Sequence, residues 1–308
     1  MGYAVAPSQI LKSLSDATAE VVEKVMPSVV SVSSRMGRGS GVAWSSDGYV
    51  VTCGHVVGRR STVRASLEGV IFEAKVVGQD PYHDVALLKT EEGAFKPIEI
   101  GDSGDLKMGQ FVLALANPFN QPSVTSGMIT SVGGASRRWG DITMENVVIT
   151  DIPLNPGYSG GPLIDVSGRM IGLNKAYTRS RGVAVLVGTV KSIVDRLAKD
   201  GKIRRAYLGI TSNTIPLPRE IARQSKIGQE AGVVVLSVRT DSPAKRAGLV
   251  FGDVIVKFNE KPVTSPYDWY GLLTEEVIGK EFKLRILREE KIRELTITPT
   301  VAEAEIEE

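Results

Sequence analysis

The chain has 308 residues, of which 42% are apolar and 23% are charged, and its formal net charge is +2 at pH 7. This composition is typical of a soluble globular protein, and the length predicts two domains of ordinary size, each able to bury a core. The near-balance of charge gives no support for a nucleic-acid partner, so we expect none.

The sequence contains no visible membrane-spanning segment or signal peptide. No apolar run reaches the roughly 18 residues of a membrane-spanning helix, and no charged segment followed by an apolar core marks a signal peptide.

The single cysteine, Cys53, cannot form an internal disulfide, so it indicates no oxidising compartment. One cysteine and two histidines disfavour a structural zinc site. We expect Cys53 to be a small buried residue of an apolar strand.

The first predicted element is a helix at residues 15–26. Ser15 is a suitable N-cap, Asp16 and Glu20 lie where the helix dipole favours acids, and Pro27 ends the helix. Apolar residues share one face of this helix and continue upstream of it: Ile10, Leu11, Leu14, Ala17, Val21, Val22 and Val25. We expect the segment to cover the domain that follows it.

Short apolar runs separated by turn signals then follow as far as residue 187, which is typical of a β-barrel protein. The predicted strands lie at residues 29–32, 40–44, 49–52, 72–77, 85–88, 111–115, 124–132, 147–149, 170–173 and 183–187. The segment Gly37-Arg38-Gly39-Ser40-Gly41 lacks the spacing of a nucleotide-binding loop, so we expect a turn into a strand there. Residues 190–199 predict a helix that ends at Gly201.

The most informative segment is Asn155-Pro156-Gly157-Tyr158-Ser159-Gly160-Gly161-Pro162. Glycines let the backbone approach a ligand, and consecutive N–H groups in such a turn can bind an oxyanion. A serine hydroxyl also needs a base that a third group orients. The order His55, Asp84, Ser159 is the chain order of a chymotrypsin-type triad. An ordinary glycine–serine loop is the alternative.

Three segments resemble the catalytic blocks of the HtrA/Deg serine proteases, at residues 52–57, 83–89 and 155–163. Residues 242–255 resemble the core signature of the PDZ domain of that family, so the resemblance covers nearly the whole chain. The chain departs from the family pattern in two places. Tyr158 replaces the usual asparagine before the serine, and Cys53 and Gly54 replace the usual polar residues before the histidine.

The resemblance implies a mainly β fold: a chymotrypsin-like double β-barrel, with six strands in each barrel and the triad in the cleft between them, followed by an α+β PDZ domain. The expected parts are an N-terminal helical segment at 1–26, a serine protease domain at 27–201, a linker at 202–206, a PDZ domain at 207–303 and an acidic tail at 304–308.

The resemblance also assigns roles. Ser159 would be the nucleophile, His55 its general base, and Asp84 the group that orients the imidazole. The N–H groups of Gly157 and Ser159, with Tyr158 as a further candidate, would form the oxyanion hole. No metal or organic cofactor is needed for this chemistry.

Two alternatives to the base and the nucleophile stay open. His83 is the rival base, but both histidines lie in strand-like segments, and on a strand His83 would point to the face opposite Asp84. A Cys53–His55 nucleophile pair is the weaker alternative, because no oxyanion turn accompanies the cysteine.

A specificity pocket is expected beside the serine, lined by Leu154, Leu173 and Tyr177. The segment before the serine has no acid at the pocket base, which disfavours a preference for Lys or Arg. If Tyr177 closes the pocket, small or medium apolar residues should precede the scissile bond. Its side chain pointing into solvent is the alternative.

In the second domain, the resemblance places a carboxylate-binding turn at Leu208-Gly209-Ile210 and a groove wall at a helix of residues 267–277. The implied function is an ATP-independent endopeptidase that cleaves unfolded or damaged proteins, with PDZ-assisted capture of peptide C-termini. The alternative is a peptide-binding scaffold or chaperone with a largely inactive protease domain. The resemblance further implies a homotrimer or larger trimer-based oligomer. Family members are often extracytoplasmic or membrane-anchored, although no anchor is visible in this sequence.

Overall fold

The computed structural model describes residues 7–34, 37–91, 95–133, 138–139, 142–143, 146–175, 181–203, 205–217 and 228–301. The chain divides into two compact units after Ile203, and the segment Arg138–Thr143 groups with the second unit. Separate clusters of buried apolar residues form the cores of the two units. Among the described helices, none is both long enough and apolar enough to cross a membrane.

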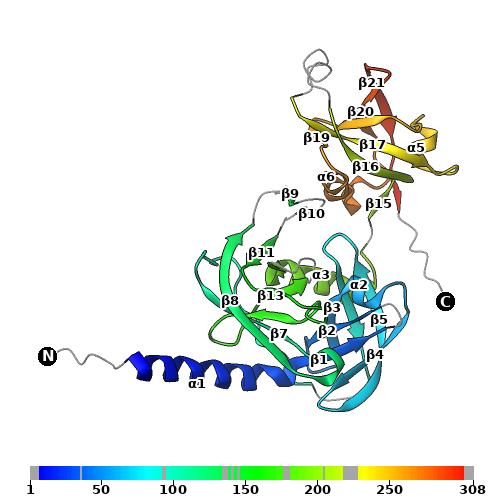
Figure 1. The fold of residues 1–308 in the computed structure, drawn as a ribbon. Coiled ribbons are helices and arrows are strands. Elements are labelled where there is room, and N and C mark those ends of the chain that lie inside the picture. The colour runs from blue at the N-terminus through cyan, green and yellow to red at the C-terminus, as the bar shows by residue number, and fades with distance from the viewer. Residues whose placement is uncertain are drawn as a thin grey trace. The chain divides into compact units, whose positions relative to one another are not determined.

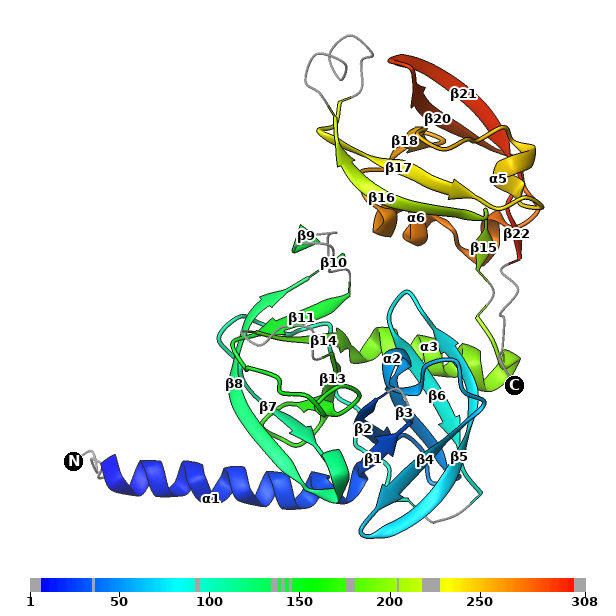
Figure 2. The same ribbon diagram turned by 45° about the vertical axis from the view of Figure 1, so that its right-hand side comes forward.

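The first unit contains two closed antiparallel barrels of six strands each (Figures 1 and 2), as the double-barrel prediction requires. The first barrel has the strand order β1-β2-β3-β6-β5-β4. Its strands are β1 (Val29–Ser33), β2 (Arg38–Ala43), β3 (Tyr49–Cys53), β4 (Thr62–Leu67), β5 (Val70–Asp80) and β6 (Val85–Lys89). Valine and alanine predominate among the buried residues of its strands, which suits the limited space inside a six-stranded barrel, and Phe72, Leu87 and Leu88 are buried with them.

The second barrel has the strand order β11-β14-β13-β12-β7-β8. Its strands are β7 (Phe111–Ala116), β8 (Ser123–Val132), β11 (Val147–Thr150), β12 (Pro162–Ile164), β13 (Met170–Lys175) and β14 (Gly182–Leu186). A 3-10 turn η2 (Pro118–Asn120) joins β7 to β8, and β9 (Arg138–Trp139) pairs with β10 (Ile142–Thr143). The short strand β12 follows the serine loop directly, so the barrel fixes one end of that loop.

The N-terminal helix α1 (Pro7–Val25) begins eight residues before the predicted N-cap, so the prediction for Ser15 is wrong. The apolar face continues upstream of Ser15, and proline is well tolerated at the first helical position because its missing N–H is not needed there. The last turns of α1 pack on the first core through Val21, Val22 and Val25, and η1 (Met26–Ser28) follows.

A second long helix, α3 (Val187–Asp200), confirms the helix predicted at residues 190–199. It ends at Gly201, which has a φ of 67° and donates its N–H to the Leu197 carbonyl oxygen at 2.9 Å. Leu197 is fully buried, and a Cβ placed on Gly78 of β5 would lie only 2.8 Å from its Cδ2. Close contact between α3 and β5 therefore requires a glycine at position 78.

The second unit is a sheet of order β16-β17-β18-β20-β21 with short helices. Its strands are β16 (Ile210–Pro216), β17 (Ala231–Val238), β18 (Val254–Phe258), β20 (Phe282–Arg288) and β21 (Lys291–Ile297). The short strand β19 (Lys261–Pro262) pairs with β18. A separate pair is formed by β15 (Ala206–Tyr207) and β22 (Thr300–Val301). Helix α5 (Pro243–Arg246) has the N-cap Ser242, whose Oγ accepts the Lys245 N–H at 3.1 Å.

The helix predicted at residues 267–277 is shorter in the structure. Helix α6 (Pro266–Leu272) begins with a capping box in which the Ser265 Oγ accepts the Asp268 N–H, and the Asp268 carboxylate accepts the Ser265 N–H. It ends at Leu273, whose φ of −83° and ψ of 55° are not helical, and a separate 3-10 turn η3 (Glu275–Val277) follows. The prediction of one continuous helix was therefore wrong at its C-terminal end.

The packing of α3 leads to a first prediction. The substitution Leu197→Ala should lower the free energy of unfolding of the first unit by about 2–5 kcal/mol, because it leaves a cavity between α3 and the first barrel. Denaturant titration measures this change. Lys199→Ala, on the exposed side of the same helix, should change it by less than about 0.5 kcal/mol. Equal effects from the two substitutions would show that α3 does not depend on this contact.

Candidate active site

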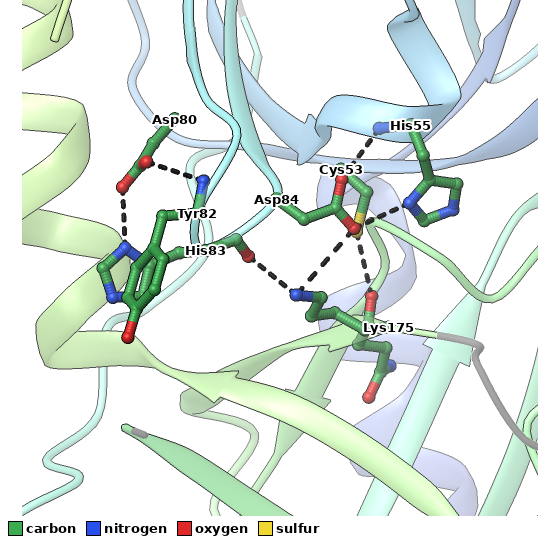
Figure 3. Close-up of polar contacts among 8 residues, drawn as sticks. Cys53, His55, Asp80, Tyr82, His83, Asp84 and Lys175 are labelled. Atoms are coloured by element: carbon green, nitrogen blue, oxygen red, sulfur yellow. Dashed lines mark hydrogen bonds and ion pairs between the residues drawn. The ribbon is translucent and has the colours of Figure 1, made fainter. Parts of the chain in front are cut away.

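The structure brings His55 and Asp84 together in the first barrel (Figure 3). The His55 Nδ1 lies 2.7 Å from the Asp84 Oδ2, and the His55 main-chain N–H donates to the Asp84 Oδ1 at 2.8 Å. His55 lies in the short helix α2 (Gly54–Val57) directly after β3, and not on a strand as predicted. Two hydrogen bonds to one carboxylate fix both the backbone and the ring of the histidine, while 43% of its side chain stays exposed.

Asp84 has an uncommon backbone conformation, with a φ of 60°. The Gly54 N–H holds this conformation by donating to the Asp84 carbonyl oxygen at 3.1 Å. A Cβ at Gly54 would lie 3.2 Å from the Asp84 Oδ1, which explains why a glycine suits this position. Positive φ at a residue other than glycine costs energy and is kept where the surroundings hold it, often at functional sites.

His83 has a partner of its own. Its Nδ1 lies 2.6 Å from the Oδ2 of Asp80, which is almost completely buried, and the Tyr82 ring packs edge-on against the imidazole at 4.7 Å. Residues 81–84 form a turn, so the predicted strand geometry, with His83 and Asp84 on opposite faces, is wrong. The turn nevertheless directs the His83 ring to Asp80, while Asp84 is paired with His55.

The serine loop connects the two barrels. Ser40, in β2 of the first barrel, donates its N–H to the Ser159 carbonyl oxygen and its Oγ–H to the Gly157 carbonyl oxygen, both at 2.8 Å. The Ser40 Oγ in turn accepts the N–H of Asn117, which follows β7, at 2.8 Å. Ser40 is fully buried, so this hydroxyl satisfies two backbone groups that have no access to water.

Two glycines give the loop its shape. Gly157 has a φ of 101°, and a Cβ there would lie 2.5 Å from the Pro118 Cβ. Gly160 has a φ of 84°, and a Cβ there would lie 2.1 Å from the Ser40 carbonyl oxygen. Both positions have positive φ and leave no room for a Cβ, so they require glycine. The two glycines therefore set the backbone conformation on either side of Ser159.

The loop's N–H groups differ in what they bind. The Tyr158 N–H donates to the Asn155 carbonyl oxygen at 3.2 Å, so it is engaged within the turn. Among the described residues, the Gly157 N–H makes no hydrogen bond. The Tyr158 side chain is buried, and that burial raises the pKa of its hydroxyl. The tyrosine therefore fills the second barrel's core, and the structure gives no support for its N–H as a third oxyanion donor.

Two of the three residues predicted to line the specificity pocket are buried in apolar clusters. Leu154 is buried in a core cluster of the second barrel, and Leu173 is fully buried in the cluster that also fills the first barrel. Tyr177 lies outside the described residues. The pocket therefore stays a prediction.

The predicted carboxylate turn of the second unit lies at one end of its sheet. The Leu208 carbonyl oxygen accepts the Ala244 N–H and the Gly209 carbonyl oxygen accepts the Arg239 N–H, both at 2.9 Å. Gly209 has a φ of 81°, and a Cβ there would lie 2.2 Å from the Ser242 Cβ. Ile210 begins β16, an edge strand of the sheet. The turn thus leads directly into a strand that an extended peptide could join.

One group of side chains has the proximity of metal ligands. Ligand atoms of Cys53, His55 and Asp84 lie within 4.8 Å of one another. However, Asp84 Oδ2 already pairs with His55 Nδ1, and the Lys175 Nζ lies 3.9 Å from the same oxygen. A metal cation bound there would meet a like charge, so we assign no metal to this group.

Sequence reasoning missed two residues of this site. The sequence predicts a turn into a strand at Ser40, but no local sequence signal indicates the contacts of its side chain with the serine loop. Lys175 ends the apolar strand β13 and is buried beside Asp84. A lysine at the end of an apolar run could have been noticed, but its partner is more than 90 residues away in the chain.

Comparison with known proteins identifies one domain in each of the two units. Residues 39–173 match the family model of the trypsin-like peptidase domain, and residues 207–298 match that of the PDZ domain. The probable periplasmic DegP-like serine endoprotease of Pseudomonas putida is 36% identical over 268 residues, which are 84% of this chain and 55% of the relative. That of Chlamydia trachomatis is 35% identical over 271 residues, 85% of this chain and 54% of the relative.

Solved structures agree with the sequence relatives. The HtrA-type protease AlgW with a decapeptide superposes with a TM-score of 0.70 at 26% identity, over 92% of this chain and 98% of that one. The chain belongs to the HtrA/Deg family of serine proteases. The serine endoprotease from Yersinia pestis superposes with a TM-score of 0.67 at 29% identity, over 92% of this chain and 98% of that one. The chain spans about half the length of the curated HtrA/Deg relatives it matches.

The environment of Cys53 leads to a second prediction. The thiol is fully buried, and its pKa is raised first by that burial and then by the neighbouring Asp84 carboxylate. Because the thiolate is the reactive form, iodoacetamide at pH 8 should alkylate Cys53 in the folded protein at least about 100-fold more slowly than in the denatured chain. Intact mass spectrometry measures both rates. Similar rates would place the thiol in contact with solvent.

Proposed function

We propose that this chain is a serine endopeptidase that uses Ser159, His55 and Asp84 as its catalytic triad. The observation that carries the proposal is the double hydrogen bond between the Asp84 carboxylate and the ring and backbone of His55. A ring Nδ1–H donated to Asp84 leaves the other ring nitrogen, Nε2, as the basic atom.

In this mechanism, the His55 Nε2 takes the proton of the Ser159 hydroxyl as Oγ attacks the scissile carbonyl carbon. The N–H groups of Gly157 and Ser159 stabilise the oxyanion of the tetrahedral intermediate, and each such donor contributes roughly 100- to 1,000-fold in rate. The imidazolium then protonates the leaving amine, and water hydrolyses the acyl-enzyme with His55 again as base. Asp84 stabilises the imidazolium in both halves of the reaction.

The triad gives a third prediction. Ser159→Ala and His55→Ala should each reduce casein cleavage by about 10⁴-fold or more, because a triad acts as a unit. His83→Asn, which keeps a donor for the buried Asp80, should stay within about tenfold of the parent. Circular dichroism confirms the fold of each variant. The triad assignment is wrong if Ser159→Ala cleaves casein at the parent rate, and the base assignment is wrong if His83→Asn is the inactive variant.

We further propose that the substrates are unfolded or damaged polypeptides and that cleavage does not require ATP. PDZ domains bind extended peptides along a sheet edge, and β16 is such an edge in the second unit. The scaffold or chaperone alternative predicts peptide binding without turnover, so casein cleavage also separates these two functions.

The second unit gives a fourth prediction. The full chain should bind a peptide with an apolar C-terminal residue at least about tenfold more weakly when its carboxylate is amidated, because backbone N–H groups at residues 208–210 would lose a charged acceptor. Fluorescence anisotropy with the Ser159→Ala chain measures binding without cleavage. Equal affinity for the free acid and the amide would exclude this turn as a carboxylate site.

A homotrimer built through the first unit is part of the same proposal. Three apolar residues in the first half of α1 expose more than half of their surface: Ile10, Leu11 and Leu14, at 55%, 67% and 54%. These side chains do not contribute to the core of the chain's own first barrel. A neighbouring copy that covers them would remove this apolar surface from water.

The helix gives a fifth prediction. Replacing Ile10, Leu11 and Leu14 together by serine should reduce the mass measured by light scattering from that of a trimer toward that of a single chain. Lys12→Ala, an exposed change in the same turns of the helix, should leave the mass unchanged. If the triple variant keeps the parent mass, α1 does not determine assembly.

A further inference from the structure

Lys175 is a buried lysine at the junction of the two barrels (Figure 3). It is the last residue of β13 in the second barrel, and only 9% of its surface is exposed. Its Nζ donates to the His83 carbonyl oxygen at 3.0 Å and lies 3.9 Å from the Asp84 Oδ2. Lysine is almost never buried to this extent without a partner, since removing its charge from water is costly.

The first contact supports the backbone of Asp84. The His83 carbonyl belongs to the peptide bond that precedes Asp84, whose φ of 60° is unfavourable for a residue with a side chain. Lys175 holds this peptide from the second barrel, and the Gly54 N–H holds the Asp84 carbonyl from the first. Asp84 is thus held on both sides, by donors that come from different barrels.

The second contact places a positive charge beside the pair of His55 and Asp84. In the part of the chain that the structure describes, two ionisable groups lie close to this pair: the Cys53 thiol at the end of β3 and the Lys175 ammonium at the end of β13. His83, which pairs with Asp80, contributes the carbonyl oxygen that Lys175 binds. The ammonium is attracted to Asp84 and repels an imidazolium on His55, so it favours the neutral imidazole.

We propose that Lys175 is a positioning residue that holds the Asp84 turn and sets the lower pH limit of the reaction. This inference rests on the proposed function, because the imidazole it acts on is the proposed general base. The ammonium lies 3.9 Å from the Asp84 Oδ2 and so opposes a second positive charge on the imidazole that is paired with this oxygen. The enzyme therefore stays active further into the acid range.

The test is the pH profile of kcat/KM on a peptide substrate. Lys175→Met, which removes the charge and the donor, should move the midpoint of the acid limb up by about 1 pH unit and lower kcat with little change in KM. Lys175→Gln removes the charge but keeps a donor for the His83 carbonyl, so it should move the limb equally with a smaller loss of kcat. Lys175→Arg should keep the parent limb.

Lys89→Met is the matched control. Lys89 ends β6 of the first barrel and pairs with Asp47 at 3.0 Å, so this change also removes a lysine and an ion pair from the unit. Its acid limb should match that of the parent. If Lys175→Met and Lys175→Gln also keep the parent limb, Lys175 has no electrostatic role at the site and the inference is overturned.

A second readout separates this inference from the proposed function. In the Ser159→Ala chain, which cannot turn over substrate, NMR follows the chemical shift of the His55 ring protons against pH. Adding Lys175→Met should move the half-way point of that change up by about 1 pH unit. An unmoved half-way point overturns the role of Lys175 even if the triad is correct. A moved one supports it even if Ser159 is not the nucleophile.

Discussion

The proposed active site depends on the hydrogen bonds that the Asp84 carboxylate accepts from His55. The ring and the backbone N–H of one residue donate to the two oxygens of the other, at 2.7 and 2.8 Å. This arrangement requires Asp84 to take a φ of 60° in the turn before β6 and His55 to begin a helical turn directly after β3. Because β3 and β6 are paired, the first barrel holds both residues at a fixed distance.

The second barrel supplies the loop that carries Ser159, the proposed nucleophile, and a few polar contacts align this loop with the first barrel. Ser40 connects β2 to the carbonyl groups of Gly157 and Ser159, and Lys175 connects β13 to the turn that carries Asp84. Both side chains are buried, so their hydrogen bonds are not weakened by competition with water. The geometry of the proposed site thus depends on contacts between the barrels as much as on the three residues of the proposed triad.

Much of this arrangement could be predicted from the sequence, for physical reasons. The apolar runs located most barrel strands, and the glycines around Ser159 indicated a backbone that side chains cannot enter, as the contacts of Gly157 and Gly160 show. Strand β4 was not predicted because Arg64 and Ser66 separate its apolar residues, and β12 was missed because it has only three residues. Short strands are specified by their partners more than by their own residues.

The errors share a cause, which is that tertiary contacts override local patterns. Local patterns predicted strands around both histidines, whereas the structure has a helical turn at His55 and a tight turn at His83. The position of His83 beside Asp84 in the sequence did not indicate its partner, because the turn directs the His83 ring back to Asp80. The position of Lys175 at the end of an apolar strand was the only local signal, and its partners could not be predicted because they come from the other barrel.

The most direct measurement of the central claim is intact-mass and peptide mass spectrometry after treatment with a fluorophosphonate, which reacts with an activated serine and releases fluoride. If His55 and Asp84 activate Ser159, the parent chain should gain one adduct, located on Ser159, and His55→Ala should gain none over the same time. A parent chain that stays unmodified, or an adduct on another residue, would contradict the account.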